Sequence, residues 1–250
     1  MSPTGTTRMV VAIDGPAASG KSSTAHWVAG RLGYRHVDSG ALYRAVTALA
    51  LREGGPVDAW TPEAVRSLAD RVTLAPVAGG FEPHVDAAPL GDAVRGADVT
   101  RHVSRVAQMP PVREWVNARV RETGASHDVV VDGRDIGTVV FPDAQLKVFL
   151  VADSWERARR RLIQSLGRHP SDDEIAEETE WLVQRDSRDA TQTVQARDAV
   201  LIDTTYLTQP EQVERIVALA RALERGIAAG AAEDARALGG PDEAAEGAAG

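Results

Sequence analysis

One short stretch near the N-terminus limits the possible folds more than any other part of the chain. Residues 15–22 read Gly-Pro-Ala-Ala-Ser-Gly-Lys-Ser, after an apolar run at 9–14 and before a helix-forming segment at 23–29. The two glycines allow the backbone to turn so that several N–H groups face one point, and the following helix directs its positive dipole end there. The stretch therefore predicts a phosphate-binding loop between a strand and a helix.

The residues of this loop predict nucleotide binding rather than an ordinary glycine-containing turn. Lys21 would reach the β- and γ-phosphates of ATP, and the Ser22 hydroxyl can ligate Mg²⁺. The chain has two lysines, Lys21 and Lys147, against 26 arginines, so a lysine at this position by chance is improbable. The predicted ATP-binding residues are Gly15, Pro16, Ala17, Ala18, Ser19, Gly20, Lys21, Ser22 and Ser23.

Composition narrows the class of protein further. The net charge of −8 argues against a general nucleic-acid surface, and the absence of cysteine excludes disulfides and thiolate metal sites. The six histidines show no pair at metal-ligand spacing, and no apolar run is long enough to span a membrane. We expect a cytoplasmic, soluble monomer with no nucleic-acid or membrane partner.

The pattern along the chain predicts an α/β fold. Short apolar strands at 9–14, 34–37, 129–131, 146–151 and 200–202 alternate with helices, which is typical of a parallel sheet covered on both faces, in three layers. Between residues 72 and 99, short β-like pieces broken by glycine and proline indicate a small antiparallel insert. The predicted order is a flexible segment 1–8, a domain 9–228 and a disordered Ala/Gly/acidic tail 229–250.

Polar clusters follow the predicted strands at the edge where ligands bind in such sheets. Asp132 ends an apolar strand and would suit a carboxylate that holds Mg²⁺, although a helix N-cap is the alternative interpretation. An arginine-rich helix begins at Ser154, and the alternative for each of its arginines is a solvated helix face. Because phosphoryl transfer needs several positive groups and exclusion of water, residues 157–192 are predicted to form a lid, with Lys21, Arg157 and Arg161 catalytic.

Several motifs together resemble the bacterial cytidylate kinase family. The motifs lie at residues 13–16, 38–44, 104–113, 133–144, 185–186 and 202–205. They follow the order of the family without interruption across about residues 9–225. The resemblance implies a P-loop nucleoside monophosphate kinase that transfers the ATP γ-phosphate to CMP or dCMP with Mg²⁺. It also implies a monophosphate-binding lobe at about 57–125.

The resemblance assigns roles to individual residues. Ser104, Arg113 and Asp135 match residues that read cytosine, and Arg44 and Arg134 match those that hold the acceptor phosphate. The other implied substrate contacts are Ser39, in the acceptor pocket, and Arg185 and Asp189, on the sugar and phosphate side. The chain departs from the family at Gln192, where an arginine is usual, so Gln192→Arg is expected to strengthen CMP binding.

Three other functions share the same loop. A GTP-dependent switch would also carry Asn-Lys-x-Asp and Asp-x-x-Gly, and neither motif occurs. A kinase of another small acceptor, such as another nucleoside monophosphate or shikimate, is disfavoured by Ser104, Arg113 and Asp135. The third alternative function is that of a non-catalytic nucleotide-binding module.

Overall fold

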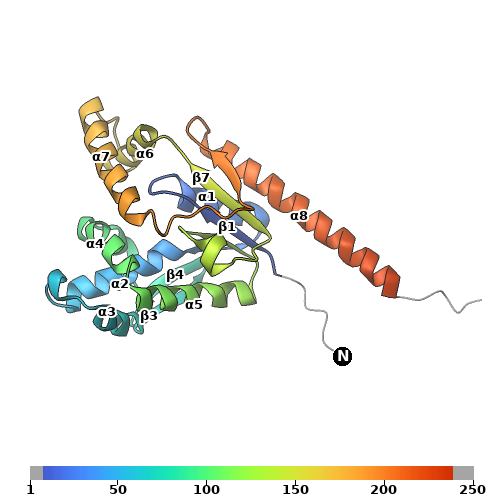
Figure 1. The fold of residues 1–250 in the computed structure, drawn as a ribbon, viewed down its shortest axis with the longest axis horizontal. Helices are drawn as coiled ribbons and strands as arrows, with labels where there is room; N and C mark the ends of the chain where they lie inside the picture. Colours follow the sequence, from blue (N-terminus) through green and yellow to red (C-terminus); the bar gives the residue numbers. More distant parts are fainter. Residues whose placement is uncertain (1–7, 239–250) are drawn as a thin grey trace, which may run out of the picture.

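Apolar runs of the sequence form a central sheet with helices on both faces (Figure 1). The computed structural model describes residues 8–238. The strands are β1 (Val10–Asp14), β2 (Arg35–Asp38), β3 (Val72–Val77), β4 (Gly80–Val85), β5 (Ala88–Pro89), β6 (Val129–Asp132), β7 (Leu146–Val151) and β8 (Val200–Asp203). The α-helices are α1 (Lys21–Leu32), α2 (Ser39–Glu53), α3 (Pro62–Ala69), α4 (Ala97–Ala107), α5 (Pro110–Ser126), α6 (Ser154–Leu166), α7 (Asp172–Asp189) and α8 (Gln209–Leu238). Shorter helical turns are η1 (Val57–Ala59), η2 (Gly91–Arg95) and the π-helical η3 (Ile136–Val140).

The sheet runs in the order β3-β4-β2-β6-β1-β7-β8, and β5 pairs with β4. Strands β2, β6, β1, β7 and β8 are parallel, and β1 lies between β6 and β7, with Val11 opposite Val130 on one side and Leu146 on the other. All five residues of β1 are buried. The predicted α/β fold with a parallel sheet is therefore confirmed.

Two apolar cores lie on opposite faces of this sheet. One contains side chains of α2, α3, α4 and α5, including Leu42, Leu49 and Trp115. The other contains side chains of α1 and α8, including Val28 and Ile216. Because β1 and β6 contribute residues to both cores, the parallel strands are covered on both faces, as their uninterrupted apolar sequences predicted.

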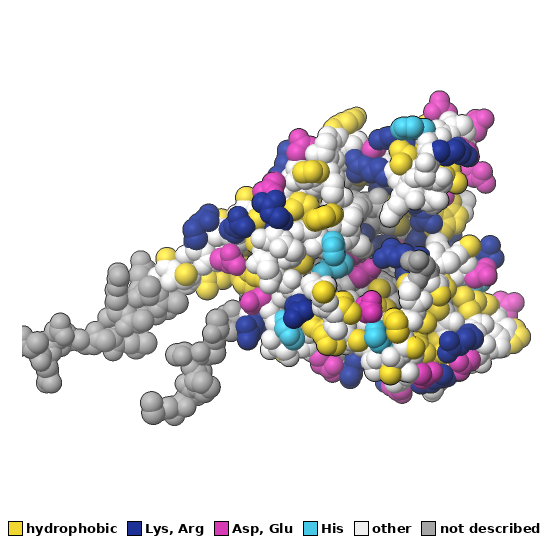
Figure 2. Space-filling view, turned by 180° about the vertical axis from the view of Figure 1, so that it is seen from behind, with side chains coloured by type: hydrophobic (Ala, Val, Ile, Leu, Met, Phe, Trp, Pro, Cys, Tyr) yellow, Lys and Arg dark blue, Asp and Glu magenta, His cyan; other side chains and the backbone are white. Residues whose placement is uncertain are grey.

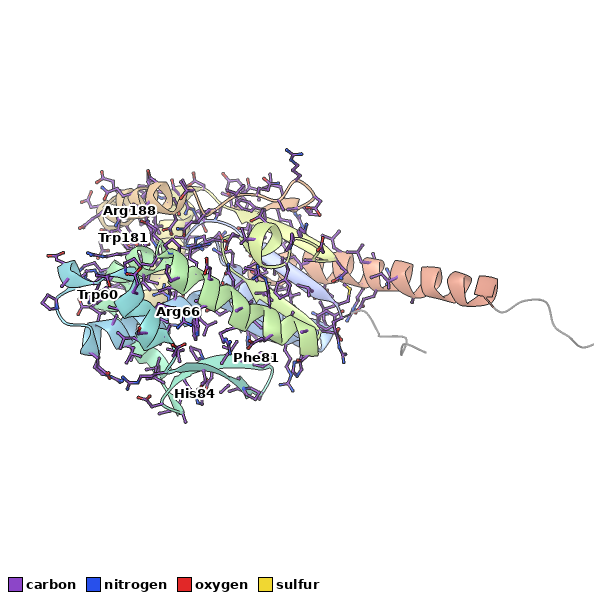
Figure 3. The ribbon with its side chains drawn as sticks, turned by 60° about the horizontal axis from the view of Figure 1, so that its bottom comes forward. Trp60, Arg66, Phe81, His84, Trp181 and Arg188 are labelled. Atoms are coloured by element: carbon purple, nitrogen blue, oxygen red, sulfur yellow. The ribbon has the colours of Figure 1, made fainter. Side chains whose placement is uncertain are left out.

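The antiparallel insert is confirmed, and it is continuous with the main sheet. Strands β3 and β4 form an antiparallel hairpin, and β4 also pairs in parallel with β2, where His36 lies opposite Gly80. A Cβ atom at Gly80 would lie 2.5 Å from the His36 carbonyl oxygen, so this junction requires glycine. Figure 3 shows the hairpin residues Phe81 and His84 on the far side of the molecule from Trp181 on α7.

Helices α6 and α7 form a separate pair over the phosphate-binding loop (Figure 1). A capping box starts α7, because Ser171 and Glu174 bond reciprocally to each other's backbone N–H groups. A small apolar cluster that includes Ala17, Ile175 and Leu182 joins these helices to the loop. The predicted lid segment is thus a helical hairpin held to the loop by limited apolar contact.

The last helix is longer than the sequence predicted. Helix α8 continues to Leu238, so residues 229–238, which were predicted to be disordered, are helical. Alanine has the highest helix propensity, which favours continuation of the helix through this alanine-rich stretch, and Gly239-Gly240-Pro241 follow in the sequence. The remaining predicted tail, 239–250, and residues 1–7 of the predicted flexible N-terminus lie outside the described residues. Within 8–238, no helix is both long and apolar enough to cross a bilayer.

Gly80→Ala is expected to destabilise the protein by about 2 kcal/mol or more, because the added methyl group would separate β4 from β2. Gly30→Ala is the matched control, since a Cβ at Gly30, within α1, meets no atom within 4 Å. That variant is expected to be neutral or more stable by up to about 1 kcal/mol. Urea denaturation of the two variants measures the difference, and similar unfolding free energies would contradict the prediction.

Candidate active site

The phosphate-binding loop connects the buried end of β1 to the start of α1. Gly15 lies so close to β7 that a Cβ atom would be 2.2 Å from the Leu150 carbonyl oxygen, and Gly20 has a left-handed φ of 86°. Helix α1 begins at Lys21, and no side chain among the described residues caps its N-terminus. The first N–H groups of the helix are therefore available to an anion at this loop.

Lys21 is buried inside the loop. Its Nζ atom donates to the Pro16 carbonyl oxygen at 2.6 Å and lies 3.4 Å from Ser19 Oγ. Burial, together with the nearby charges of Arg134 and Arg185, lowers the pKa of Lys21 well below its ordinary value, against the opposing charges of Asp132 and Asp14. A bound polyphosphate would reverse this effect by supplying the missing negative charge.

Four arginines surround the same region, and their charges are only partly neutralised. Burial, reinforced by the charges of Arg134, Arg44 and Arg161, lowers the pKa of Arg185 to about 10 although Asp189 opposes the shift. Asp189 is shared, with its Oδ2 atom 3.7 Å from Arg134 Nε and 3.8 Å from Arg185 Nε. Within the described part of the chain, neither of these buried Nε atoms has a hydrogen-bond acceptor. In Figure 2, dark-blue side chains of lysine and arginine border a hollow on the face shown.

Trp181 on α7 supports two of these arginines. The Arg161 guanidinium carbon lies 4.5 Å from the centre of the indole ring, and that of Arg185 lies 5.4 Å from it. Arg161 also pairs with Glu178 at 2.9 Å. Figure 3 shows Trp181 on the helical pair. Cation–π attraction therefore helps to hold like charges close together on the predicted lid.

Arg157, at the start of α6, contacts the phosphate-binding loop and α7. Its Nη1 atom donates to the Ala17 carbonyl oxygen at 2.8 Å and to Asp186 Oδ2 at 2.6 Å. Asp186 Oδ1 in turn accepts from the Ala17 backbone N–H at 3.0 Å. These contacts hold the loop to α6 and α7, and the catalytic role of Arg157 stays a prediction.

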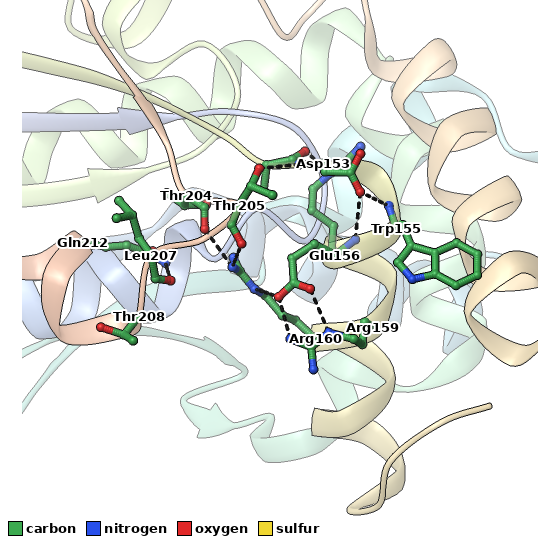
Figure 4. A network of polar contacts seen from close by, with 12 residues as sticks. Asp153, Trp155, Glu156, Arg159, Arg160, Thr204, Thr205, Leu207, Thr208 and Gln212 are labelled. Carbon is green, nitrogen blue, oxygen red and sulfur yellow. Dashed lines mark hydrogen bonds and ion pairs between the residues drawn. The ribbon is translucent and has the colours of Figure 1, made fainter. Parts of the chain in front are cut away.

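A second network attaches α6 to the segment after β8 (Figure 4). Arg160 Nη2 donates to the carbonyl oxygens of Thr204 and Thr205 at 2.7 and 2.8 Å, while its Nε atom bonds Glu156. The hydroxyl oxygen of Thr205 accepts from the Asp153 backbone N–H. Arg157, Arg160 and Arg161 each contact a group outside α6. Arg159, whose side chain is 41% exposed, pairs within the described residues only with Glu156 on the same helix, so the alternative of a solvated helix face applies to Arg159.

The predicted base-reading residues lie at the other side of the site. Arg113 on α5 pairs with Asp135, which follows β6, and donates to the Ala107 carbonyl oxygen at the end of α4. Ser104 is buried on α4, one turn before Ala107. Burial, opposed by Arg113, raises the pKa of Asp135 above its ordinary value. The structure thus joins Arg113 and Asp135, while within residues 8–238 no hydrogen bond links the Ser104 side chain to either of them.

Two further predicted substrate contacts have partners within the protein. Ser39 donates to the Asp132 carbonyl oxygen at 2.7 Å, so it supports the turn after β6. Arg44 donates to Thr100 at 3.1 Å, and burial is the largest effect that lowers its pKa.

The proposed metal ligands contact each other directly. Ser22 Oγ donates to Asp132 Oδ2 at 2.5 Å, and His36 Nε2 lies 2.8 Å from Asp132 Oδ1. Both carboxylate oxygens of Asp132 thus have side-chain partners. The next helical segment, η3, begins at Ile136 after Asp135, so Asp132 is not a helix N-cap. In residues 8–238, no group of three or more His, Cys, Asp and Glu side chains could hold a metal ion. A hydroxyl beside a carboxylate nevertheless fits Mg²⁺, which takes few protein oxygens when substrate phosphates supply the others.

The matching family model is described as cytidylate kinase and covers residues 11–222. The chain belongs to the cytidylate kinase family. The cytidylate kinase of Chlorobaculum tepidum is 42% identical over 82% of this chain and 89% of its own length. That of Geobacillus kaustophilus is 45% identical over 84% of this chain and 95% of its own length.

Another relative is a longer protein. The bifunctional pantoate ligase/cytidylate kinase of Synechococcus sp. is 44% identical over 89% of this chain, which spans 42% of that relative's length. Among solved structures, a shikimate kinase from Bacteroides thetaiotaomicron aligns with a TM-score of 0.44 and 15% identity, covering 87% of this chain and 98% of that one. The family assignment rests on the sequence matches.

Sequence reasoning gave no role to several residues of this cytidylate kinase site. Asp14 accepts from the backbone N–H groups of Ile136 and Gly137, both at 2.8 Å, and so fixes the turn that carries Asp135. The signal for Asp14 was an acid at the end of a wholly apolar strand. Asp186 and His36 gave no such signal, because their partners are distant in the sequence.

Asp14 is expected to make the stability depend on pH. Burial, partly offset by the two backbone N–H groups, raises the pKa of Asp14 to about 6. Because the folded state then binds this proton more tightly than the unfolded chain, the contribution of Asp14 to stability falls as the pH rises from about 4 to about 6. Relative to Asp14→Asn, the unfolding free energy of the unmodified protein should drop by about 1 kcal/mol between about pH 5 and about pH 7. A constant difference in urea denaturation would contradict this.

Proposed function

We propose that this member of the cytidylate kinase family transfers the γ-phosphate of ATP to CMP or dCMP, giving ADP and CDP or dCDP. One observation carries the proposal: Lys21 of the phosphate-binding loop belongs to a cluster of cations with Arg44, Arg134, Arg161 and Arg185 that is short of negative charge. The charge of Arg134 also acts on Asp135, the partner of Arg113. Two phosphorylated substrates would supply the charge that these groups lack. The curated relatives named cytidylate kinase support the same assignment.

The residues around the loop would stabilise the phosphoryl group in flight. Lys21 and Arg161 would neutralise charge on its oxygens, and the free N–H groups of α1 would bind the ATP phosphates. Ser22 and Asp132 would hold Mg²⁺ bound with ATP, which supplies charge neutralisation between the phosphates. Arg157 would keep the loop and the helical pair together, since its partners are Ala17 and Asp186.

The acceptor would lie across the cluster from the loop. Arg44 and Arg134 would bind its phosphate, and Arg185 with Asp189 would contact its sugar and phosphate side. Asp135 would accept from the amino group of cytosine, while Arg113 and Ser104 would donate to the ring. Helices α6 and α7 would close over the site and exclude water. The expected cytoplasmic location and monomeric state stay predictions.

Lys21→Ala is expected to lower kcat by on the order of a hundredfold or more, because Lys21 would neutralise charge that develops in the transition state. The fold should be unaffected, since the variant removes a buried cation from a cluster of like charges. Steady-state release of ADP with CMP as acceptor measures the loss, and thermal unfolding controls for stability. Turnover close to that of the unmodified protein would remove Lys21 from the mechanism.

Base choice is expected to favour CMP over UMP by roughly a hundredfold or more in kcat/KM, because uracil would present a carbonyl to the Asp135 carboxylate and leave two acceptors opposed. Asp135→Ala should remove most of this difference by impairing CMP, whereas Lys21→Ala should slow both substrates equally. ADP release with CMP, UMP, other monophosphates and shikimate tests the assignment. Equal use of CMP and UMP would contradict cytosine selection, and preference for shikimate would contradict the proposed acceptor.

A further inference from the structure

Gln192 lies just beyond α7 and contacts the candidate base-reading arginine. Its Oε1 atom accepts a hydrogen bond from Arg113 Nη1 at 2.9 Å. The Gln192 backbone N–H donates to the Asp189 carbonyl oxygen at 2.9 Å, which fixes this segment to the end of the helix. The residue is half-buried, so the contact lies within the molecule. Gln192 is therefore placed to influence Arg113 directly.

The other partners of Arg113 show what this contact does. Arg113 Nη1 has two hydrogens, and their acceptors are the Ala107 carbonyl oxygen at 2.9 Å and Gln192 Oε1. Nη2 donates to Asp135 Oδ2. Among the described residues, the second Nη2 hydrogen and the Nε hydrogen have no acceptor. Because the guanidinium group is planar and rigid, fixing Nη1 with two acceptors also fixes the direction of these free donors.

We infer that Gln192 is a positioning residue for base recognition, which orients Arg113 so that its free N–H groups meet the acceptor atoms of the cytosine ring. The inference rests on the proposed function and adds a determinant of base choice to it. Gln192 itself need not touch the substrate. Its amide oxygen matters because it accepts a hydrogen bond from Arg113 Nη1.

This geometry reverses the expectation drawn from the sequence alone. There, the absence of an arginine at position 192 suggested a missing positive charge and weaker CMP binding. An arginine at this position would instead bring a second guanidinium group to Arg113 Nη1 and remove its acceptor. Like-charge repulsion and an unpaired donor would both disturb Arg113, so Gln192→Arg is expected to weaken CMP binding.

The test compares steady-state kinetics of the full-length protein with CMP, UMP and ATP varied in turn. Gln192→Leu, which keeps the size but removes the acceptor, is expected to raise KM for CMP about tenfold with little change in kcat, and to lower the CMP/UMP ratio of kcat/KM by a similar factor. Gln192→Glu retains an acceptor and should stay within about threefold of the unmodified protein. Gln195→Leu, at an exposed glutamine of the same segment, is the matched control and should change nothing.

Three outcomes would overturn the inference. An unchanged KM for CMP in Gln192→Leu would show that Gln192 does not act through Arg113. Equal losses of kcat/KM for CMP and UMP would indicate that Gln192 acts on phosphate binding or on the helical pair rather than on base choice. Tighter CMP binding by Gln192→Arg would restore the interpretation of a missing positive charge. If Gln192→Leu unfolds on heating far below the unmodified protein, the Glu and Arg variants decide between the outcomes. Failure of the proposed function would appear separately, as absence of CMP phosphorylation by the unmodified protein.

Discussion

Repulsion among the cations around the phosphate-binding loop is the constraint on which the rest of this structure depends. The charges of Arg134 and Arg185 add to burial in lowering the pKa of Lys21, and that of Arg134 does the same to Arg185, while Asp189 neutralises the two arginines only in part. Such a cluster persists only where the surrounding fold enforces it. The fold does so by placing each cation on a different rigid element: the start of α1, the turn after β6 and the buried face of α7.

The loop is also where these elements meet. Asp14, at its start, holds the turn that carries Asp135, and Asp132 contacts Ser22 just behind Lys21. Arg157 on α6 donates to the Ala17 carbonyl oxygen, and Asp186 on α7 accepts from the Ala17 N–H group. The nucleotide-binding loop, the acceptor side and the helical pair are therefore linked by hydrogen bonds through a few buried groups. An anion bound at the loop would relieve the repulsion and act on all three parts at once.

The acceptor side depends on a similar arrangement around Arg113. Its guanidinium group meets groups from α4, from the turn after β6 and from the segment after α7. Selection among bases requires donors fixed in direction, because a mobile arginine could adapt to several bases. The Gln192 contact from beyond α7 would thus connect the proposed base choice to the position of the helical pair.

The sequence alone determined the local features of this protein. The apolar strands predicted a parallel sheet, and the short β-like pieces between residues 72 and 99 predicted an antiparallel insert, because these signals act between neighbours in the chain. The loop predicted phosphate binding for the same reason. Tertiary structure decided the remainder: the junction of β4 with β2 at Gly80, the position of Arg157 against the loop and the contact of Gln192 with Arg113. Those contacts join residues far apart in the sequence, and a side chain's partner there depends on how the elements pack rather than on its neighbours along the chain.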